Sequence, residues 1–300
     1  MAKLLDGKQA AKSIRTALRR QIRLWMADGH PQPHAVFIQV GDNPASSQYV
    51  GMKNRQAEKI GCRSTIELLP DDTTQQELLA RLAIHNADPG VHSILVQLPL
   101  PAHMDEQQVA ESISPLKDVD CFHPENVGRV ALGLPAPRPA TPQGIINLLD
   151  ANGIELQGKH AVVLGRSNLV GKPLGLLLLE RNCTVTYCHS RTADLGAVTR
   201  QADILVAAAG RAGLVTGEMV KQDVVAVDVG TNFVHILDDA GEPEYDADGE
   251  PRMMLVGDLV FDEVAEKASW ISPVPGGVGP MTIATVLENT VALYRRIEGV

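Results

Sequence analysis

The sequence predicts an α/β protein of two α/β domains with mostly parallel sheets. Short apolar runs alternate with amphipathic helical patterns along almost the whole chain, and this alternation is typical of βαβ units. The chain has 300 residues, enough for about two domains of roughly 150 residues each. The expected strands, all buried on both faces, are residues 34–40, 91–97, 160–165, 184–188, 203–210 and 224–230.

Two breaks in composition divide the chain. The proline-rich stretch GLPAPRPATPQG (133–144) suits a stiff connector and cannot form a central strand. The second break, SPVPGGVGP (272–280), precedes a last helix. We therefore expect a first domain over 1–139, completed by a C-terminal helix within 273–300, and a second domain over 140–272.

Composition narrows the class of protein. A net charge of −9 and an aromatic content of 3% argue against nucleic acid or an anionic membrane as the main partner. The N-terminus has no secretory signal pattern, and the apolar stretches are too short to cross a bilayer. The four cysteines form no CxxC pair, which disfavours a metal site and favours free thiols in the cytoplasm.

The segment HAVVLGRSNLVGKPLGLLLLE (160–180) predicts a strand, a glycine-containing turn and a helix. Gly165, Gly171 and Gly175 are more widely spaced than in GxGxxG, but glycine still lets backbone approach a phosphate at a helix N-terminus. A tight turn without ligand is the alternative. Arg166 and Ser167, both polar and at the tip of the turn, favour a nucleotide.

The following strand favours NADP over NAD. NAD-binding domains usually place an acidic residue about 20 positions after the glycine loop, where it binds the ribose hydroxyls. Here TVTYC is followed by Ser190 and Arg191, and the first carboxylate is Asp194. A hydroxyl and an arginine suit a ribose 2′-phosphate.

A helix with clear end signals carries a tyrosine and a lysine. Asn43 suits the N-cap, Pro44 the first helical position and Gly61 the C-terminal cap. Tyr49 and Lys53 would then lie one turn apart on the same face. A solvated helix face is the alternative for such a pair.

Two loops supply further polar groups. Gln97 follows the strand 91–97, where sites form in parallel sheets, and Asp118 and Asp120 lie in LKDVDCFHPEN (116–126). Taken singly, these residues suit capping or turn formation. Together with the tyrosine and lysine they predict an active site.

A Tyr-x-x-x-Lys pair is also the catalytic signature of short-chain dehydrogenases. Those enzymes resemble this chain only in that pair, and their glycine loop precedes the tyrosine and lysine. Here Tyr49 and Lys53 come before Gly165. We therefore reject that alternative.

Several motifs in order resemble one enzyme family. PASSQYVGMK, VQLPLP, KDVDCFHPENVG, TPQG, GRSNLVGKP, CHSRT and PVPGGVGPMT are similar to those of bifunctional methylenetetrahydrofolate dehydrogenase/methenyltetrahydrofolate cyclohydrolases, with matches from about residue 6 to 295. The resemblance implies a homodimer whose subunit has a catalytic domain, a Rossmann-like NADP-binding domain and a cleft between them. It implies tetrahydrofolate derivatives as substrates.

The resemblance also implies residue roles. Lys53 would be the catalytic group, Tyr49 would pack on the folate, Gln97 would set the state of Lys53, and Asp120 would anchor the pterin. The residues expected to line the cofactor are Gly165, Arg166, Ser167, Ser190 and Thr231, with Arg191 at the 2′-phosphate.

The sequence departs from the family pattern in places. Thr231 stands where an aliphatic residue is common, so its main chain is the expected contact, and GDLVFDEV (257–264) differs from the usual GDVxF. The acidic segment 238–252 is expected to form a surface hairpin or loop without assigned function. Two alternatives stay open: a nucleotide-binding regulatory protein without catalysis, and a dehydrogenase without cyclohydrolase activity.

Overall fold

The computed structural model describes residues 2–238, 241–246 and 249–300, which form two compact units. The six-stranded unit comprises Met1–Ala10 and Gly144–Met281, and the three-stranded unit comprises Ala11–Gln143 and Thr282–Val300. The boundaries fall inside helices α1 (Gly7–Ala27), α6 (Ala140–Ala151) and α10 (Val278–Glu298). The expected division of function at 139/140 and 272/273 stays a prediction.

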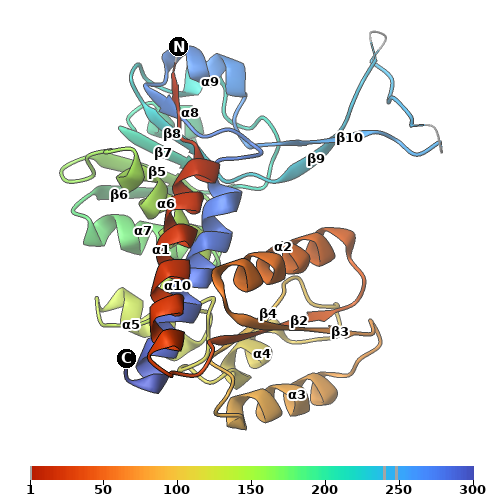
Figure 1. Ribbon diagram of the computed structural model, residues 1–300. Coiled ribbons are helices and arrows are strands. Elements are labelled where there is room, and N and C mark those ends of the chain that lie inside the picture. The colour runs from red at the N-terminus through yellow and green to blue at the C-terminus, as the bar shows by residue number, and fades with distance from the viewer. Residues whose placement is uncertain (1, 239–240, 247–248) are drawn as a thin grey trace. The chain divides into compact units, whose positions relative to one another are not determined.

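The six-stranded unit is built on a parallel sheet with strand order β1-β11-β8-β7-β5-β6 (Figure 1). Its strands are β1 (Lys3–Leu4), β5 (His160–Leu164), β6 (Thr184–Cys188), β7 (Ile204–Ala207), β8 (Val225–Asp228) and β11 (Trp270–Ile271). Helix α7 (Gly171–Glu180) packs on β5 and β6. Apolar side chains of α8 (Leu195–Thr199), the 3₁₀ helix η1 (Gly217–Met219) and α9 (Phe261–Lys267) share a core with the sheet.

The strand order reverses at β5. The chain passes from β5 to β6 on one side, and then returns to add β7 on the other side of β5. In open α/β sheets, ligands bind outside the carboxyl ends of the strands at such a switch point. The loops after β5 and β7 therefore occupy the expected ligand position of this unit.

The three-stranded unit has the parallel order β3-β2-β4, with β2 (His34–Val40) between β3 (Arg63–Leu69) and β4 (Ser93–Val96). Figure 1 shows α2 (Pro44–Ile60) on one face of this sheet and α3 (Gln75–Ala87) and α4 (Glu106–Ser112) on the other. The alternation of β2 explains this layering, because Ala35 and Phe37 enter the core on the α2 side while Val36 and Ile38 enter the other. Helix α5 (Pro124–Ala131) follows α4.

The last helix completes the core of the three-stranded unit. Val286, Leu287, Val291 and Leu293 of α10 are buried in the same cluster as Phe37. On this helix the Nδ2 group of Asn289 donates to the main-chain oxygens of Val119 and Arg138, each at 2.7 Å. The sequence prediction that a C-terminal helix returns to the first part of the chain agrees with this arrangement.

The six predicted strands occur, and one of them differs from the prediction in its burial. The strand 184–188 was expected to be buried on both faces, but β6 is the edge strand of its sheet, so Thr184 and Tyr187 are exposed. Strand β3 was not predicted from the sequence. This strand is an edge strand too, and its side chains alternate between half-buried and exposed, with Leu68 67% exposed. Edge strands lack the continuous apolar pattern of central parallel strands.

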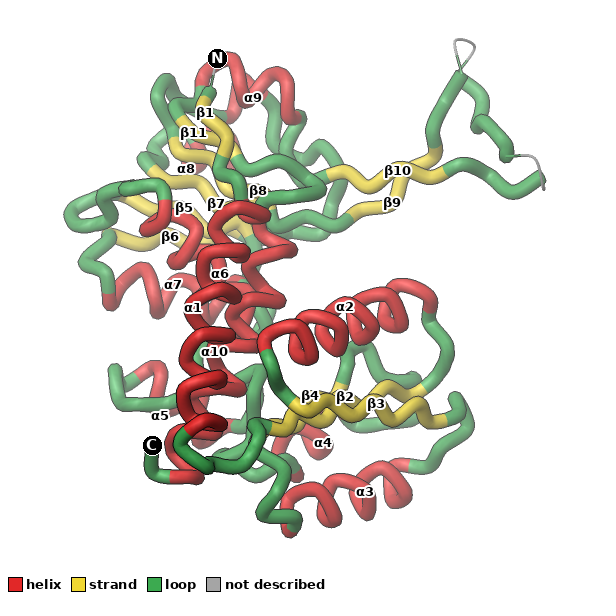
Figure 2. Tube along the Cα trace, in the orientation of Figure 1, coloured by secondary structure: helices red, strands yellow, loops and turns green. Residues whose placement is uncertain are grey.

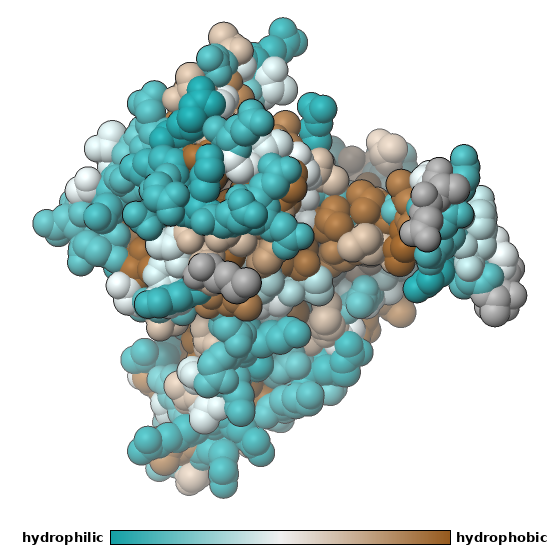
Figure 3. All heavy atoms as spheres, turned by 90° about the horizontal axis from the view of Figure 1, so that it is seen from above, coloured by the Kyte–Doolittle hydropathy of each residue, from teal (hydrophilic) through white to brown (hydrophobic). Residues whose placement is uncertain are grey.

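Strands β9 (Asn232–His235) and β10 (Met253–Val256) form an antiparallel ribbon that projects from the rest of the six-stranded unit (Figure 2). The expected hairpin or loop over 238–252 falls between them, and residues 239–240 and 247–248 lie outside the described part of the chain. Large apolar side chains are exposed along the ribbon and are seen as brown atoms in Figure 3; they are Phe233, Leu237, Met253 and Met254.

Among the residues that the structure describes, no helix is both long enough and apolar enough to cross a bilayer.

Candidate active site

Helix α2 begins and ends where the sequence predicted. The side chain of Asn43 accepts a hydrogen bond from the backbone N–H of Ser46 at 3.1 Å, and Pro44 is the first helical residue. Gly61 ends the helix in the left-handed conformation, with φ of +100°. Lys53 belongs to the buried face of this helix, which is formed by Ser46, Val50, Lys53, Ala57 and Ile60.

A buried glutamine, which the sequence analysis missed, ties the start of α2 to the sheet. Gln39 of β2 is 1% exposed, and its Nε2 group donates to the hydroxyl of Ser47 at 2.8 Å and to the main-chain oxygen of Gly41 at 2.9 Å. The signal that could have revealed it is a polar residue inside an otherwise apolar central strand, since such a buried group needs hydrogen-bond partners.

Lys53 is buried and contacts Gln97. Its side chain is 6% exposed, and its Nζ group donates to Oε1 of Gln97 at 3.0 Å. The Nε2 group of Gln97 donates to the main-chain oxygen of Leu98 at 2.6 Å, which directs Oε1 toward the lysine. The backbone of Gln97 is itself held by Ile38 of β2. Tyr49 lies one turn before Lys53 and is half-buried.

The two aspartates of the loop 116–126 have different roles. Asp118 is 1% exposed and accepts hydrogen bonds from the backbone N–H groups of Phe122 and His123 and from Nδ2 of Asn126. It therefore shapes the loop. Asp120 is only partly covered, and it lies close enough to Lys53 for their charges to interact.

Burial acts on both members of the lysine–aspartate pair. Removal from water lowers the pKa of Lys53, and the nearby Asp120 partly opposes this shift. Burial also raises the pKa of Asp120; Lys53 opposes that change, whereas Asp118 adds to it. Burial thus favours the neutral form of each group, while the charge of the partner favours the ionised form. A buried lysine whose pKa is lowered is a candidate for proton transfer.

The loop after β5 has the geometry of a phosphate cradle. Gly165 has φ of +131°, and a Cβ atom there would lie 2.2 Å from the main-chain oxygen of Ala208. A Cβ atom on Gly171 would lie 2.3 Å from the oxygen of Gly165, so only glycine fits at either position. Helix α7 begins at Gly171 and directs its first N–H groups toward this loop. The hydroxyl of Ser167 already accepts from Val170 N–H at 3.1 Å.

Gly175 has a different role from the one expected. It lies in the middle of α7, where a Cβ atom would be 1.9 Å from the hydroxyl of Tyr187 on β6. The glycine therefore allows close packing between helix and strand, which is the function of the third glycine in dinucleotide-binding loops. Tyr187 in turn donates to the main-chain oxygen of Lys172 at 2.8 Å.

The residues after β6 fit a 2′-phosphate. Ser190 and Arg191 are exposed, and the backbone N–H of Arg191 donates to Nδ1 of His189 at 3.1 Å. Asp194, the first carboxylate after this strand, accepts from Ala197 N–H at 2.9 Å and caps α8. Its capping role makes it a poor ligand for ribose hydroxyls. The donor set thus fits NADP.

Two further predicted cofactor residues lie at the same edge of the sheet. Arg166 follows Gly165 and is exposed, and Thr231 is exposed three positions after the end of β8. Since β8, β7, β5 and β6 are consecutive in a parallel sheet, the loops that follow them share its carboxyl edge. The structure thus brings all six predicted cofactor residues to one edge of one unit.

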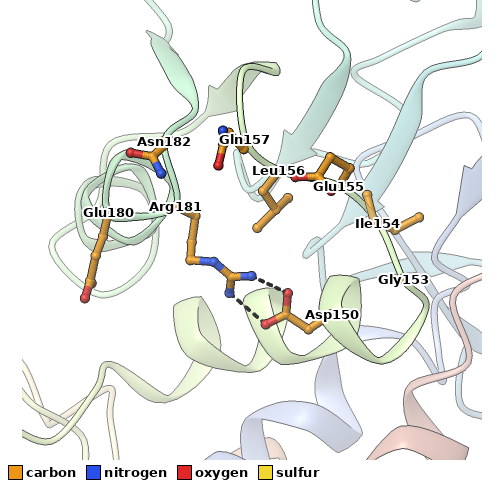
Figure 4. A pocket seen from close by; sticks show the side chains of 9 residues that line it. All are labelled: Asp150, Gly153, Ile154, Glu155, Leu156, Gln157, Glu180, Arg181 and Asn182. Carbon is orange, nitrogen blue, oxygen red and sulfur yellow. Dashed lines mark hydrogen bonds and ion pairs between the residues drawn. The ribbon is translucent and has the colours of Figure 1, made fainter.

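A hollow elsewhere in the six-stranded unit does not suit a dinucleotide. It lies at the amino edge of the sheet, between the end of α6 and the end of α7, and is lined by the acidic residues Asp150, Glu155 and Glu180. Figure 4 shows Arg181 directed at Asp150, with two hydrogen bonds of 2.7 Å. The one arginine at this hollow is therefore already paired, and the remaining carboxylates would repel phosphate.

Comparison with known proteins finds a matching family model for each of two parts of the chain. The model of the tetrahydrofolate dehydrogenase/cyclohydrolase catalytic domain matches residues 5–120, and the model of the corresponding NAD(P)-binding domain matches residues 139–298. Proteins called bifunctional protein FolD from Halothermothrix orenii and Moorella thermoacetica are 51% and 48% identical to this chain. The alignments cover 100% of both chains for the first, and 98% of this chain and 99% of the relative for the second.

Solved structures are similar over the same length. The bifunctional FolD enzyme of Campylobacter jejuni is 44% identical with a TM-score of 0.90, and 99% of each chain is covered. The Trypanosoma brucei enzyme, solved with NADP and an inhibitor, is 37% identical with a TM-score of 0.90, and 98% of each chain is covered. The chain therefore belongs to the tetrahydrofolate dehydrogenase/cyclohydrolase family.

Proposed function

We propose that this protein oxidises methylenetetrahydrofolate to methenyltetrahydrofolate with NADP and hydrolyses the product to formyltetrahydrofolate. The observation that carries the proposal is the buried Lys53, bonded to Gln97 and coupled to Asp120. Full-length similarity to bifunctional relatives supports it. In this proposal the three-stranded unit supplies the folate-binding and catalytic residues, and the six-stranded unit binds the cofactor.

The residues predicted to line the cofactor would bind NADP and hold it in place. When bound, NADP would supply the acceptor for the hydride that leaves the one-carbon bridge of the folate. Gly165, Arg166 and Ser167 would hold the phosphates at the start of α7, where the helix dipole favours negative charge. Ser190 and Arg191 would hold the 2′-phosphate, and the main chain at Thr231 would complete the site.

Lys53 would act in both steps. Loss of hydride leaves a positively charged methenyl group, so a charged ammonium nearby would raise the barrier of the first step. Burial lowers the pKa of Lys53 and favours the neutral amine. The neutral amine can then take a proton from the water that attacks the methenyl carbon in the second step.

The neighbours of Lys53 would position it and the folate. Gln97 presents a carbonyl oxygen to the amine, because its own amide N–H is bonded to Leu98. Asp120 would bind the amino face of the pterin, and its negative form would favour positive charge on the folate. Tyr49 would pack its ring on the folate.

Purified protein with methylenetetrahydrofolate and either NADP or NAD tests the proposal. Reduced cofactor, methenyl species and formyl product are followed separately. We expect NADP-dependent reduction with little methenyl build-up, because the same site consumes it. Accumulation of methenyl species, with formyl product forming only at the uncatalysed rate, would leave a dehydrogenase alone. No reduction with either cofactor would favour a regulatory protein and contradict the proposal.

Arg191 should determine the choice between NADP and NAD. We expect Arg191→Gln to raise the KM for NADP by about 10- to 100-fold, since a hydrogen bond to a charged group contributes about 1.5–3 kcal/mol. The KM for NAD, which has no 2′-phosphate, should change by less than about twofold. Arg181→Gln is the control, because Arg181 is exposed in the same unit but is paired with Asp150. An equal rise for NADP and NAD would contradict this role.

We also propose that the protein is a cytoplasmic homodimer. Exposed apolar side chains on β9 and β10 support association of two copies, because an exposed ribbon with apolar residues offers both surface and free strand edges. All four cysteines are free and buried, which supports a reducing compartment. A mass of one chain by light scattering would contradict the dimer.

A further inference from the structure

Two buried aspartates at the carboxyl edge of the six-stranded sheet have no place in the mechanism above. Asp228 is the last residue of β8 and is 3% exposed, and Asp258 follows β10 and is 0% exposed. The hydrogen bonds that they accept come from backbone and amide N–H groups. A buried carboxylate is costly unless such donors surround it, so its presence points to a requirement for those bonds.

Asp258 joins two loops that are distant in the sequence. Its Oδ2 atom accepts from the backbone N–H groups of Ala209 at 2.6 Å and Gly210 at 3.0 Å. Its Oδ1 atom accepts from Arg211 N–H and from Nδ2 of Asn232, both at 2.9 Å. Three of these donors are consecutive residues of the loop after β7, and the fourth follows Thr231. One carboxylate therefore fixes the loops after β7 and β8 to each other.

Asp228 holds Asp258 in place. Its Oδ1 atom accepts from the backbone N–H groups of Gly230 and Asp258, and its Oδ2 atom accepts from that of Leu259, all at 2.9 Å. The packing is tight, because a Cβ atom on Gly257 would lie 1.8 Å from Oδ2 of Asp228. The backbone that carries Asp258 is thus held in place by the buried carboxylate of Asp228.

The loop that Asp258 holds supports the glycine loop after β5. Ala208 immediately precedes the three bonded residues, and its main-chain oxygen would lie 2.2 Å from a Cβ atom on Gly165. The two loops follow the neighbouring strands β5 and β7, at the point where the strand order reverses. A shift of residues 209–211 would therefore change the space available at Gly165, and a shift of Asn232 would move Thr231.

We propose that Asp258 is a positioning residue for the dinucleotide, which acts by holding the loop after β7 and the segment at Thr231 in the arrangement that binds the cofactor. This inference rests on the proposed function of the six-stranded unit as the NADP-binding domain. Asp258 is fully buried and bonded to protein groups, so it would affect cofactor affinity through two loops.

Asp258→Asn tests the inference with little change in size. Whichever way the amide turns, its NH2 group would face two N–H donors, so at least two of the four bonds are lost. We expect the dissociation constant for NADP, measured by calorimetry, to rise at least about tenfold. The KM for NADP should rise in parallel. Cyclohydrolase turnover should change by less than about twofold, since Lys53 and Gln97 lie in the other unit.

Asp203→Asn is the matched control. Asp203 accepts from the backbone N–H of His160 at 2.8 Å and pairs with Lys221, but it lies at the amino edge of the same sheet. This variant weakens the bonds of a carboxylate that holds the start of a strand, without disturbing the loops of the carboxyl edge. Its melting temperature should fall, and its affinity for NADP should not.

The milder variant Asn232→Ala removes one of the four bonds and should raise the dissociation constant by a smaller factor than Asp258→Asn. Unchanged NADP affinity in folded Asp258→Asn, or an equal loss in Asp203→Asn, would overturn the inference. Absence of NADP-dependent oxidation by the wild type would instead contradict the proposed function. Calorimetric binding of NADP to the variants would then still decide the role of Asp258.

Discussion

Lys53→Met is expected to abolish the cyclohydrolase step and to leave cofactor binding intact. Methionine keeps most of the length of the side chain and suits a buried position, so the main loss is the amine that would take a proton from water. Removal of a general base typically costs about 100- to 10,000-fold in rate. The rate is measured as conversion of methenyl- to formyltetrahydrofolate, and NADP binding is measured by calorimetry in the same preparation.

The control for this variant is Lys59→Met. Lys59 is six residues further along α2 and is exposed, so its replacement removes the same charge from the same helix without touching the site. Its rates should stay within about twofold of the wild type, as for most surface substitutions. Conversion by Lys53→Met above the uncatalysed rate would refute the role of Lys53 as the base.

Burial of Lys53 reduces the stability of the fold, so its position is better explained by a role in function. A buried lysine must lose its proton or keep a charge in poor solvent, and both reduce the stability of the fold. Lys117 of the same unit is also buried, but its Nζ group donates to three main-chain oxygens, those of His85, Asn86 and Asp88. Among the residues that the structure describes, the Nζ group of Lys53 donates only to the amide oxygen of Gln97. The amine of Lys53 is thus left with capacity for a substrate or water.

Much of the fold could be predicted because central parallel strands carry a local signal. HAVFIQV is buried at all seven positions of β2, and the run is apolar enough to be recognised. RSTIELL forms the edge strand β3, where polar residues interrupt the apolar ones and the apolar Ile66 and Leu68 are exposed, and it was missed. Strands β1 and β11 have two residues each, too few for any periodicity.

The site could be predicted where its signals were local or its motifs familiar. The caps of α2 depend on Asn43, Pro44 and Gly61, which act within one helix. The role of Asp258 depends on contacts 26 and 49 residues away, with Asn232 and Ala209, and no pattern in the sequence brings these residues together. Tertiary structure was needed to find it.

Gly165→Ala is expected to abolish NADP binding, and with it the dehydrogenase step, while the cyclohydrolase step survives. A Cβ atom at this position would lie 2.2 Å from the main-chain oxygen of Ala208, and φ of +131° disfavours any side chain. Backbone strain of this kind costs about 1–3 kcal/mol before the clash is counted. We expect the dissociation constant for NADP to rise at least about 100-fold, which corresponds to about 2.8 kcal/mol.

Gly158→Ala is the control, because it replaces a glycine of positive φ without creating the clash expected at Gly165. Gly158 lies in the same unit with φ of +74°, and a Cβ atom there would meet nothing within 4 Å. It should lower the melting temperature slightly and leave NADP affinity unchanged. Retention of NADP affinity by Gly165→Ala would mean that the loop after β5 does not hold the phosphates. Because Lys53→Met should lose the second step and keep the cofactor, the two variants together test whether the two units carry separable parts of the reaction.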